Sequence, residues 1–189
     1  MVVCMLSMPQ SKKKSFNQIK IHSQYSICEG ALKIENLKEY CKKNKIQSVG
    51  LSDTNNLSGA LEFSENISSV GTQPIIGSQI QFKFKNTYGL IPLIAKNYIG
   101  YKNIIELSSK AYLENVSNDQ PHCSIDDLTK YSEGIIVLSG SINNLLGNIY
   151  NKGLFEELDE LIIIINNHFK ENFYLEIQRH GDENEKQFE

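Results

Sequence analysis

Several residue types that often define a protein class are scarce in this chain. It has no Trp, four Cys and four Pro in 189 residues. The cysteines form no CxxC pair and have no His at finger spacing, which argues against a zinc ribbon or zinc finger. No apolar run approaches the ~18 residues of a membrane span, so we expect no membrane partner. A net charge of −3 provides no overall positive field to attract nucleic acid.

The remaining composition is that of an ordinary folded domain. Hydrophobic residues make up 40% of the chain and charged residues 22%, which excludes collagen-like, disordered and disulfide-scaffold classes. Apolar residues precede the three lysines at 12–14, the reverse of the order in a secretory signal peptide. We therefore predict a cytoplasmic protein with reduced thiols, a poorly ordered tail over residues 1–15 and one domain over residues 16–189.

Strand-like apolar runs alternate with segments of helical periodicity. Strands are predicted at residues 17–21, 47–51, 74–84, 89–95, 134–138 and 173–178. Helices are predicted at residues 34–44, 98–112 and 154–169, after the caps Ser58 and Ser124, and around Leu145. This order predicts an α/β fold with a largely parallel sheet, and periodicity leaves open whether that sheet is open or closed into a barrel. No Gly-rich phosphate loop follows the first strand, which disfavours a nucleotide-binding open sheet.

Polar side chains follow several of the predicted strands. Chemistry in parallel α/β folds gathers at such strand ends. The residues concerned are His22, Ser23, Glu29, Ser52–Asn56, Gln79, Ser139–Ser141, Arg179, His180 and Asp182. A purely structural interpretation is also available, with helix caps among residues 52–56 and a hydrogen-bonded core imidazole at His22. Both interpretations stay open at this point.

Five ordered motifs carry a family resemblance. Residues 21–63 read IHSQYSICEGALKIENLKEYCKKNKIQSVGLSDTNNLSGALEF. Then come PIIG (74–77), LIAKNYIGYKNIIELSSKAY (93–112), GIIVLSG (134–140) and FYLEIQRHG (173–181). Over about residues 16–189 the chain resembles the PHP (polymerase and histidinol phosphatase) domain of bacterial DNA polymerase III alpha subunits. The phrase at residues 96–103 and the EIQRHG ending distinguish this polymerase branch from stand-alone PHP phosphatases.

The resemblance implies a distorted, TIM-like (β/α)7 barrel, of which this chain supplies about the first five βα units. The palm, thumb and fingers of the polymerase are absent, and with them the catalytic aspartates and their Mg²⁺. We therefore expect a parent DNA-directed DNA polymerase, a nucleotidyltransferase, but no activity from this chain alone. The implied partners are the rest of the alpha chain and the proofreading exonuclease subunit, with DNA bound only through the full polymerase.

The resemblance also implies where a PHP metal cluster would lie. Its positions are matched by Lys20, His22, Glu29, Thr54, Gln79, Leu90 and Ser141. His22 and Glu29 keep ligand chemistry, as weak candidates. Imidazole is replaced at Lys20, Thr54 and Leu90, carboxylate at Gln79 and thiolate at Ser141, so we expect a vestigial site with no catalytic residue and no cofactor. Zn²⁺ or Mn²⁺ is implied only under the alternative that the chain is a PHP-type metal-dependent phosphoesterase. An unrelated α/β binding domain is a third hypothesis.

Overall fold

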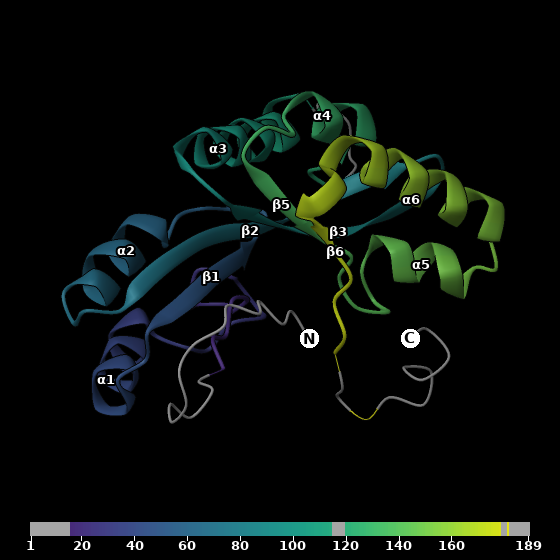
Figure 1. Ribbon diagram of the computed structural model, residues 1–189. Coiled ribbons are helices and arrows are strands. Elements are labelled where there is room, and N and C mark those ends of the chain that lie inside the picture. Colours follow the sequence, from purple (N-terminus) through teal and green to yellow (C-terminus); the bar gives the residue numbers. More distant parts are fainter. Residues whose placement is uncertain (1–15, 115–119, 179–180, 182–189) are drawn as a thin grey trace.

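A computed structural model describes residues 16–114, 120–178 and 181 as one mixed α/β unit (Figure 1). The predicted tail over residues 1–15 lies outside the described residues. The elements in chain order are α1 (Ile34–Asn44), β1 (Ser48–Thr54), α2 (Ala60–Ser68), β2 (Gln73–Phe84), β3 (Thr87–Ala95), α3 (Tyr98–Leu113), β4 (Cys123–Ser124), α4 (Ile125–Lys130), β5 (Ile135–Leu138), α5 (Leu145–Asn151), α6 (Phe155–Phe169), the 3-10 turn η1 (Lys170–Asn172) and β6 (Phe173–Tyr174).

The described strands form one six-stranded sheet in the order β1-β2-β3-β5-β6, with β4 beside β2. Strand β1 is parallel to β2, and β5 is parallel to β6. Strand β3, however, runs antiparallel to both β2 and β5, so the predicted largely parallel sheet is wrong at this point. The cause is the two-residue turn Lys85–Asn86 between β2 and β3, which is too short for the crossover that a parallel pair needs. Lys85 takes a positive φ of 50° in this turn.

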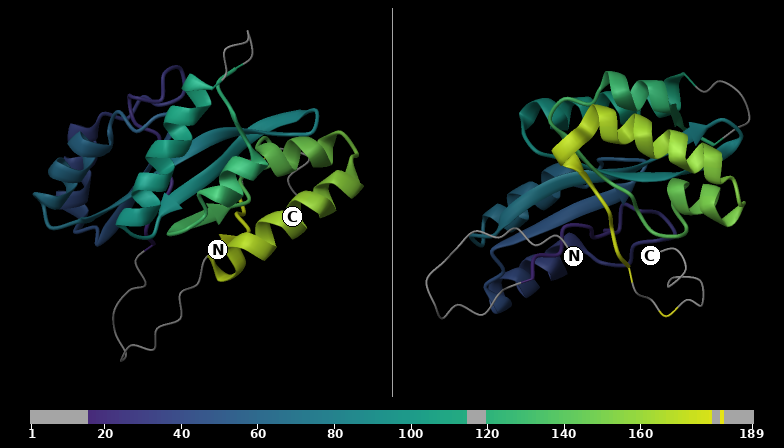
Figure 2. Two further views of the ribbon diagram at one scale, coloured as in Figure 1. Left: turned by 90° about the horizontal axis from the view of Figure 1, so that it is seen from above. Right: turned by 45° about the vertical axis from the view of Figure 1, so that its right-hand side comes forward.

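The two faces of the sheet have different neighbours, because successive side chains on a strand point in opposite directions. Leu93 and Val137 belong to the main hydrophobic core beneath α3, α4 and α6, whereas their neighbours Ile94 and Ile136 line a cavity on the opposite face. A second core joins β1 to α1 and α2 through Val49, Leu51, Ile34, Leu37, Cys41, Phe63 and Ile67. Figure 2 shows helices α3, α4 and α6 gathered over one side of the sheet.

The predicted first strand is an extended segment along the outer edge of β1. The Gly50 amide donates to the Gln18 carbonyl at 2.8 Å, and the Ser52 amide donates to the Ile21 carbonyl at 2.8 Å. The pairing is a single parallel bridge between Ile21 and Leu51 and not a full strand. Position 50 must be glycine here, because a Cβ would lie 2.1 Å from the Ile19 carbonyl oxygen.

Three further sequence predictions concern element ends. Ser124 caps α4 as expected, in a capping box with Asp127. Ser58 does not cap α2: the N-cap residue is Gly59, which makes no side-chain capping bond. The last strand is shorter than the predicted 173–178, because only Phe173 and Tyr174 pair with β5.

Within the part of the chain that the structure describes, no helix combines the length and apolarity needed to cross a membrane.

The close contact between α3 and the turn before β5 generates a stability prediction. A Cβ on Gly100 would lie 1.8 Å from the Gly134 carbonyl oxygen, a backbone atom that cannot move aside alone. We expect Gly100→Ala to lower the free energy of unfolding by more than about 2 kcal/mol.

Gly71→Ala is the matched control, because φ at Gly71 is +78° but a Cβ there would meet nothing within 4 Å. It should cost about 1 kcal/mol, the strain of a left-handed non-glycine residue. Urea unfolding of both variants measures the difference. Equal losses in the two variants would contradict the packing argument.

Candidate functional site

The structure brings six of the seven predicted site positions into linked contacts. Thr54 and Gln79 are register partners on β1 and β2, and Leu90 on β3 is paired with Gln81. His22 and Glu29 lie in the loop before α1, with 3.9 Å between His22 Nδ1 and a Glu29 carboxylate oxygen. Ser141 follows β5. Lys20, the seventh position, pairs with a residue that the sequence analysis did not identify as a site residue, Glu176.

Asp53 anchors the loop that carries His22 and Glu29. Its side chain, 1% exposed, accepts hydrogen bonds from the Ser23 amide at 2.7 Å, the Ser23 hydroxyl at 2.8 Å and the Ser26 hydroxyl at 2.7 Å. The Ser26 hydroxyl oxygen also accepts from the Thr54 amide at 3.1 Å. The loop is thereby fixed to the end of β1 by hydrogen bonds to a charged acceptor, which are stronger than neutral ones.

A chain of amide groups links the position after β5 to His22. The Ser141 backbone amide can only donate, so the atom of Asn144 that it meets at 3.0 Å is Oδ1. Asn144 Nδ2 then donates to the Leu90 carbonyl and to Gln79 Oε1, both at 3.3 Å. This leaves Gln79 Nε2 to face His22 Nε2 at 3.0 Å. An amide nitrogen cannot accept, so His22 Nε2 accepts and its ring proton is on Nδ1.

The surroundings of His22 favour the neutral ring. Burial lowers the pKa of His22 below its ordinary value of 6.5, and the nearby Lys20 ammonium lowers it further. Glu29, Asp53 and Glu176 act in the opposite direction without reversing the shift. Protonating Nε2 would also remove the acceptor that Gln79 uses. The ring lone pair is therefore engaged by a protein donor.

The remaining three contacts involve charged side chains. The Thr54 hydroxyl donates to a carboxylate oxygen of Glu29. The Lys20 ammonium lies 2.6 Å from Glu176 Oε1, and both side chains are largely buried. The Gln178 amide also donates to Glu176 Oε1. Among the described residues, none provides a hydrogen-bond donor to the buried Glu176 Oε2.

The sequence analysis missed Asn144, Glu176 and the role of Ser26 as site residues. Ser26 belongs to the quoted HSQYS motif and Glu176 to the EIQRHG ending, so motif position was a usable signal for both. Asn144 carried no such signal: it is the N-cap residue of α5, yet its side chain bonds across to β2 and β3 and makes no cap. Arg179, His180 and Asp182 lie outside the described residues.

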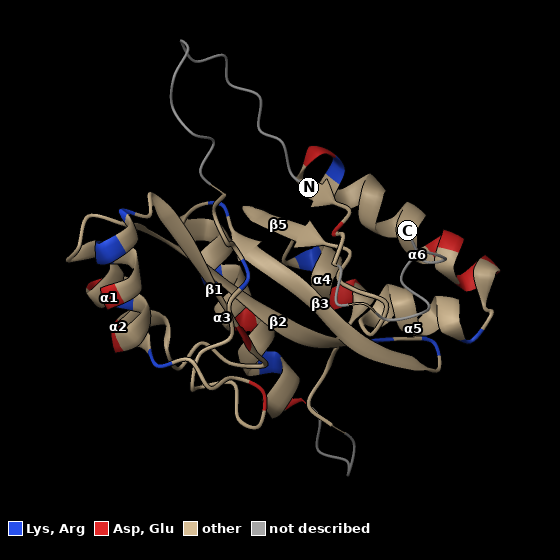
Figure 3. Ribbon diagram, turned by 90° about the horizontal axis from the view of Figure 1, so that it is seen from below, with Lys and Arg blue, Asp and Glu red and all other residues tan. Residues whose placement is uncertain are grey.

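The charged groups and hydrogen-bond donors of the site decide what it could bind. No group of three or more His, Cys, Asp or Glu side chains among residues 16–114, 120–178 and 181 is arranged to hold a metal ion. Figure 3 shows basic and acidic positions interspersed on the helices, with acidic positions at the start of α6, where Glu156 and Glu157 occupy the first turn. Within the described residues the site is therefore a network of amides and hydroxyls with one short ion pair.

The comparison with known families identifies the fold. The sequence matches the PHP domain over residues 18–180. The chain belongs to the PHP domain family. Among curated relatives, DNA polymerase III subunit alpha of Borreliella burgdorferi is 37% identical over 183 residues, which cover 90% of this chain and 16% of that protein. The Caulobacter vibrioides subunit is 32% identical over 183 residues, with 92% and 16% covered. This PHP chain thus spans about a sixth of the length of these relatives.

The solved structures are more distant in sequence than these relatives. An amidohydrolase from Chromobacterium violaceum, with bound sulfate and no metal, superposes with a TM-score of 0.48 at 10% identity, covering 85% of each chain.

The lowered pKa of His22 predicts the direction of a pH effect. An unfolded chain protonates His22 near its ordinary pKa of 6.5, whereas the folded chain resists protonation. The unfolded state therefore binds more protons below that pH, and stability decreases as pH falls from 7 to 5. We expect His22→Gln to reduce this slope of the free energy of unfolding against pH.

The control is His168→Gln, which removes an exposed imidazole near the end of α6. It should leave the slope as in the wild type. Denaturant unfolding at half-unit pH intervals gives both slopes, and a wild-type slope in His22→Gln would contradict the prediction.

Proposed function

We propose that this chain is the PHP-domain portion of a bacterial DNA polymerase III alpha subunit, acting in replication as a structural and subunit-docking module. The observation that carries the proposal is the match to alpha subunits at 37% and 32% identity, each over about nine-tenths of this chain. The family match over residues 18–180 agrees with it. We place this function in the cytoplasm, where bacterial replication takes place.

Nucleotidyl transfer is assigned to other parts of such a subunit. The chain corresponds to 16% of the length of these relatives. The resemblance assigns the catalytic aspartates and their Mg²⁺ to the palm, and DNA binding to the full polymerase. The partners that we propose for this chain are therefore the rest of the alpha subunit and the proofreading exonuclease subunit.

We further propose that the ancestral PHP metal chemistry is absent. A metal cluster needs lone pairs directed at common points, from imidazole, carboxylate or thiolate groups. At the matching positions, the His22 Nε2 lone pair accepts from Gln79 and a Glu29 oxygen accepts from Thr54. Lys20 places an ammonium group within the site, which opposes a bound cation. These contacts support a vestigial site, so we assign no zinc, manganese or other cofactor to this chain.

The barrel is also part of the proposal. A TIM-like barrel closes when the first and last strands of a curved sheet meet. The contact between Lys20, beside β1, and Glu176, just after β6, supports a sheet curved in this sense. We propose that residues 16–189 form part of such a barrel, with about five of the seven βα units.

The metal hypothesis predicts a result from thermal unfolding. We expect about 50 µM Zn²⁺ or Mn²⁺ to change the melting temperature by less than about 1 °C, because stabilisation follows RT ln(1 + [L]/Kd) and a site without ligands has a large Kd. A matched reversion variant restores ligand chemistry by Lys20→His, Thr54→His, Gln79→Glu, Leu90→His and Ser141→Cys. It should gain several degrees with the same ions.

A wild-type shift of several degrees that His22→Ala abolishes would instead favour the metal-dependent phosphoesterase. Phosphatase activity that His22→Ala abolishes would also favour the metal-dependent phosphoesterase.

The polymerase assignment is tested on the gene. We expect the reading frame to continue after codon 189 into an Asp-x-His strand and an aspartate-rich palm. Sequencing the downstream DNA decides between the hypotheses. A stop codon followed by an unrelated gene would remove the polymerase assignment, while leaving the family membership of the domain unchanged.

A further inference from the structure

The Lys20–Glu176 ion pair joins two segments from opposite ends of the sheet. Lys20 lies in the extended segment beside β1, and Glu176 lies two residues after β6. Strands β1 and β6 are the first and last members of the sheet order. A distance of 2.6 Å between Lys20 Nζ and Glu176 Oε1 therefore requires the sheet to curve until its two edges meet.

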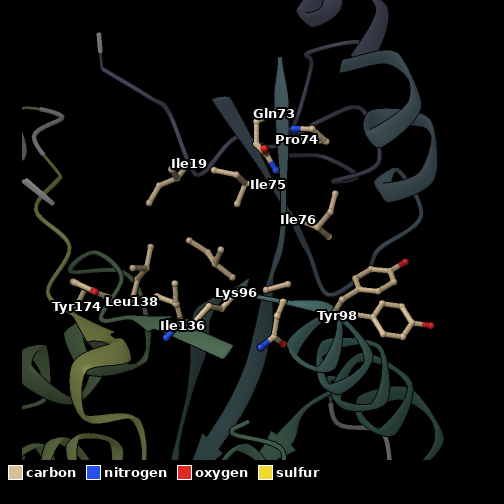
Figure 4. Close-up of a pocket in the computed structure, with 14 residues that line it drawn as sticks. Ile19, Gln73, Pro74, Ile75, Ile76, Lys96, Tyr98, Ile136, Leu138 and Tyr174 are labelled. Atoms are coloured by element: carbon tan, nitrogen blue, oxygen red, sulfur yellow. The ribbon is translucent and has the colours of Figure 1, made fainter. Parts of the chain in front are cut away.

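Residues close to the pair in sequence line an apolar cavity. The cavity, of about 630 Å³, is lined by side chains from both edges and from the strands between them. Ile19 precedes Lys20 on one edge and Tyr174 comes just before Glu176 on the other, and both contribute to the lining. Figure 4 shows Ile19 and Ile75 on one side of the cavity and Ile136, Leu138 and Tyr174 on another.

Burial distinguishes this pair from an ordinary surface ion pair. The side chains of Lys20 and Glu176 are 13% and 15% exposed, against 42% and 51% for the pair Lys85–Glu160. Exposed pairs contribute little, because water and salt screen them. In a buried pair, loss of one partner leaves an uncompensated charge, which is strongly destabilising.

Glu176 depends heavily on Lys20 for compensation. Its Oε2 atom is buried and meets no donor in the part of the chain that the structure describes, so the carboxylate has lost water there without a hydrogen bond in return. Its Oε1 atom pairs with the Lys20 ammonium and accepts a hydrogen bond from the neutral amide of Gln178. Lys20 thus supplies the cation in this contact, at a position where the family resemblance expects a metal ligand.

We propose that Lys20 is a built-in cation of this domain, which takes the place of a metal ion and, through Glu176, holds the two edges of the sheet together around the cavity. The pair fixes the extended segment 17–21 and the segment after β6 as one unit. This proposal rests on the geometry of the chain and is independent of the polymerase assignment.

A double-mutant cycle tests the proposal. Lys20→Met should reduce the folding equilibrium constant by about 10- to 100-fold, because Glu176 stays buried without its cation. Lys20→Met combined with Glu176→Gln should recover a large part of that loss, because the buried charge is gone. The matched cycle uses Lys85→Met and Glu160→Gln, and each change there should alter the constant by less than about 5-fold.

Amide hydrogen exchange separates an edge contact from general destabilisation. In Lys20→Met, exchange should increase at residues 18–21 and 173–178 more than in the core helix α3. Lys85→Met should leave both edges as in the wild type. If Lys20→Met does not fold, the double variant decides the matter: a folded double variant supports the proposal. A double variant that is also unfolded, or edges that exchange at the wild-type rate in a folded Lys20→Met, would overturn it.

Discussion

The buried carboxylate of Asp53 is the group on which the arrangement of the site depends. It ends the buried part of β1 and accepts three hydrogen bonds from Ser23 and Ser26. Ser26 in turn accepts a hydrogen bond from the Thr54 amide, so the loop and the end of β1 are joined by hydrogen bonds in both directions. Loss of such an acceptor would leave buried donors unpaired, at a cost of about 1–3 kcal/mol each. The positions of His22 and Glu29 follow from this anchor, since both lie in the loop that it fixes.

The donor and acceptor roles of the polar groups in the site follow from one backbone amide. The Ser141 amide orients Asn144, Asn144 orients Gln79, and Gln79 selects the tautomer of His22. Imidazole and carboxylate ligands are acceptors that need a cation between them. A carboxamide carries both a donor and an acceptor, so Gln79 and Asn144 can join neighbouring groups directly. The amides of Asn144 and Gln79 thus link the segment after β5 to the His22 ring by direct hydrogen bonds.

Periodicity predicted most elements because they depend on local pattern: α1, α3 and α6 begin and end within about a residue of the expected positions. The strand β3 was predicted but its antiparallel direction was not, because the two-residue turn at Lys85–Asn86 was not recognised between two apolar runs. The family resemblance led to the site positions, and their contacts in the structure agree with a common location. Asn144 and Glu176 could not be derived in this way, because the segments that they join are far apart in the chain. Asn144 bonds to Gln79 and Leu90, 65 and 54 positions away, and Glu176 pairs with Lys20 near the start of the domain.

The two faces of the sheet explain how a PHP domain can keep its fold while its site changes. Ile80, Leu93 and Val137 face the helices in the main core, where burial of apolar surface supplies most of the stability. Gln79 and Ile94 lie next to these residues in sequence but point to the other face, as the alternation of a strand requires. Substitutions on the inner face therefore leave the helix-facing core intact. A buried polar side chain on this face needs a hydrogen-bond partner, and Gln79 has two, His22 and Asn144.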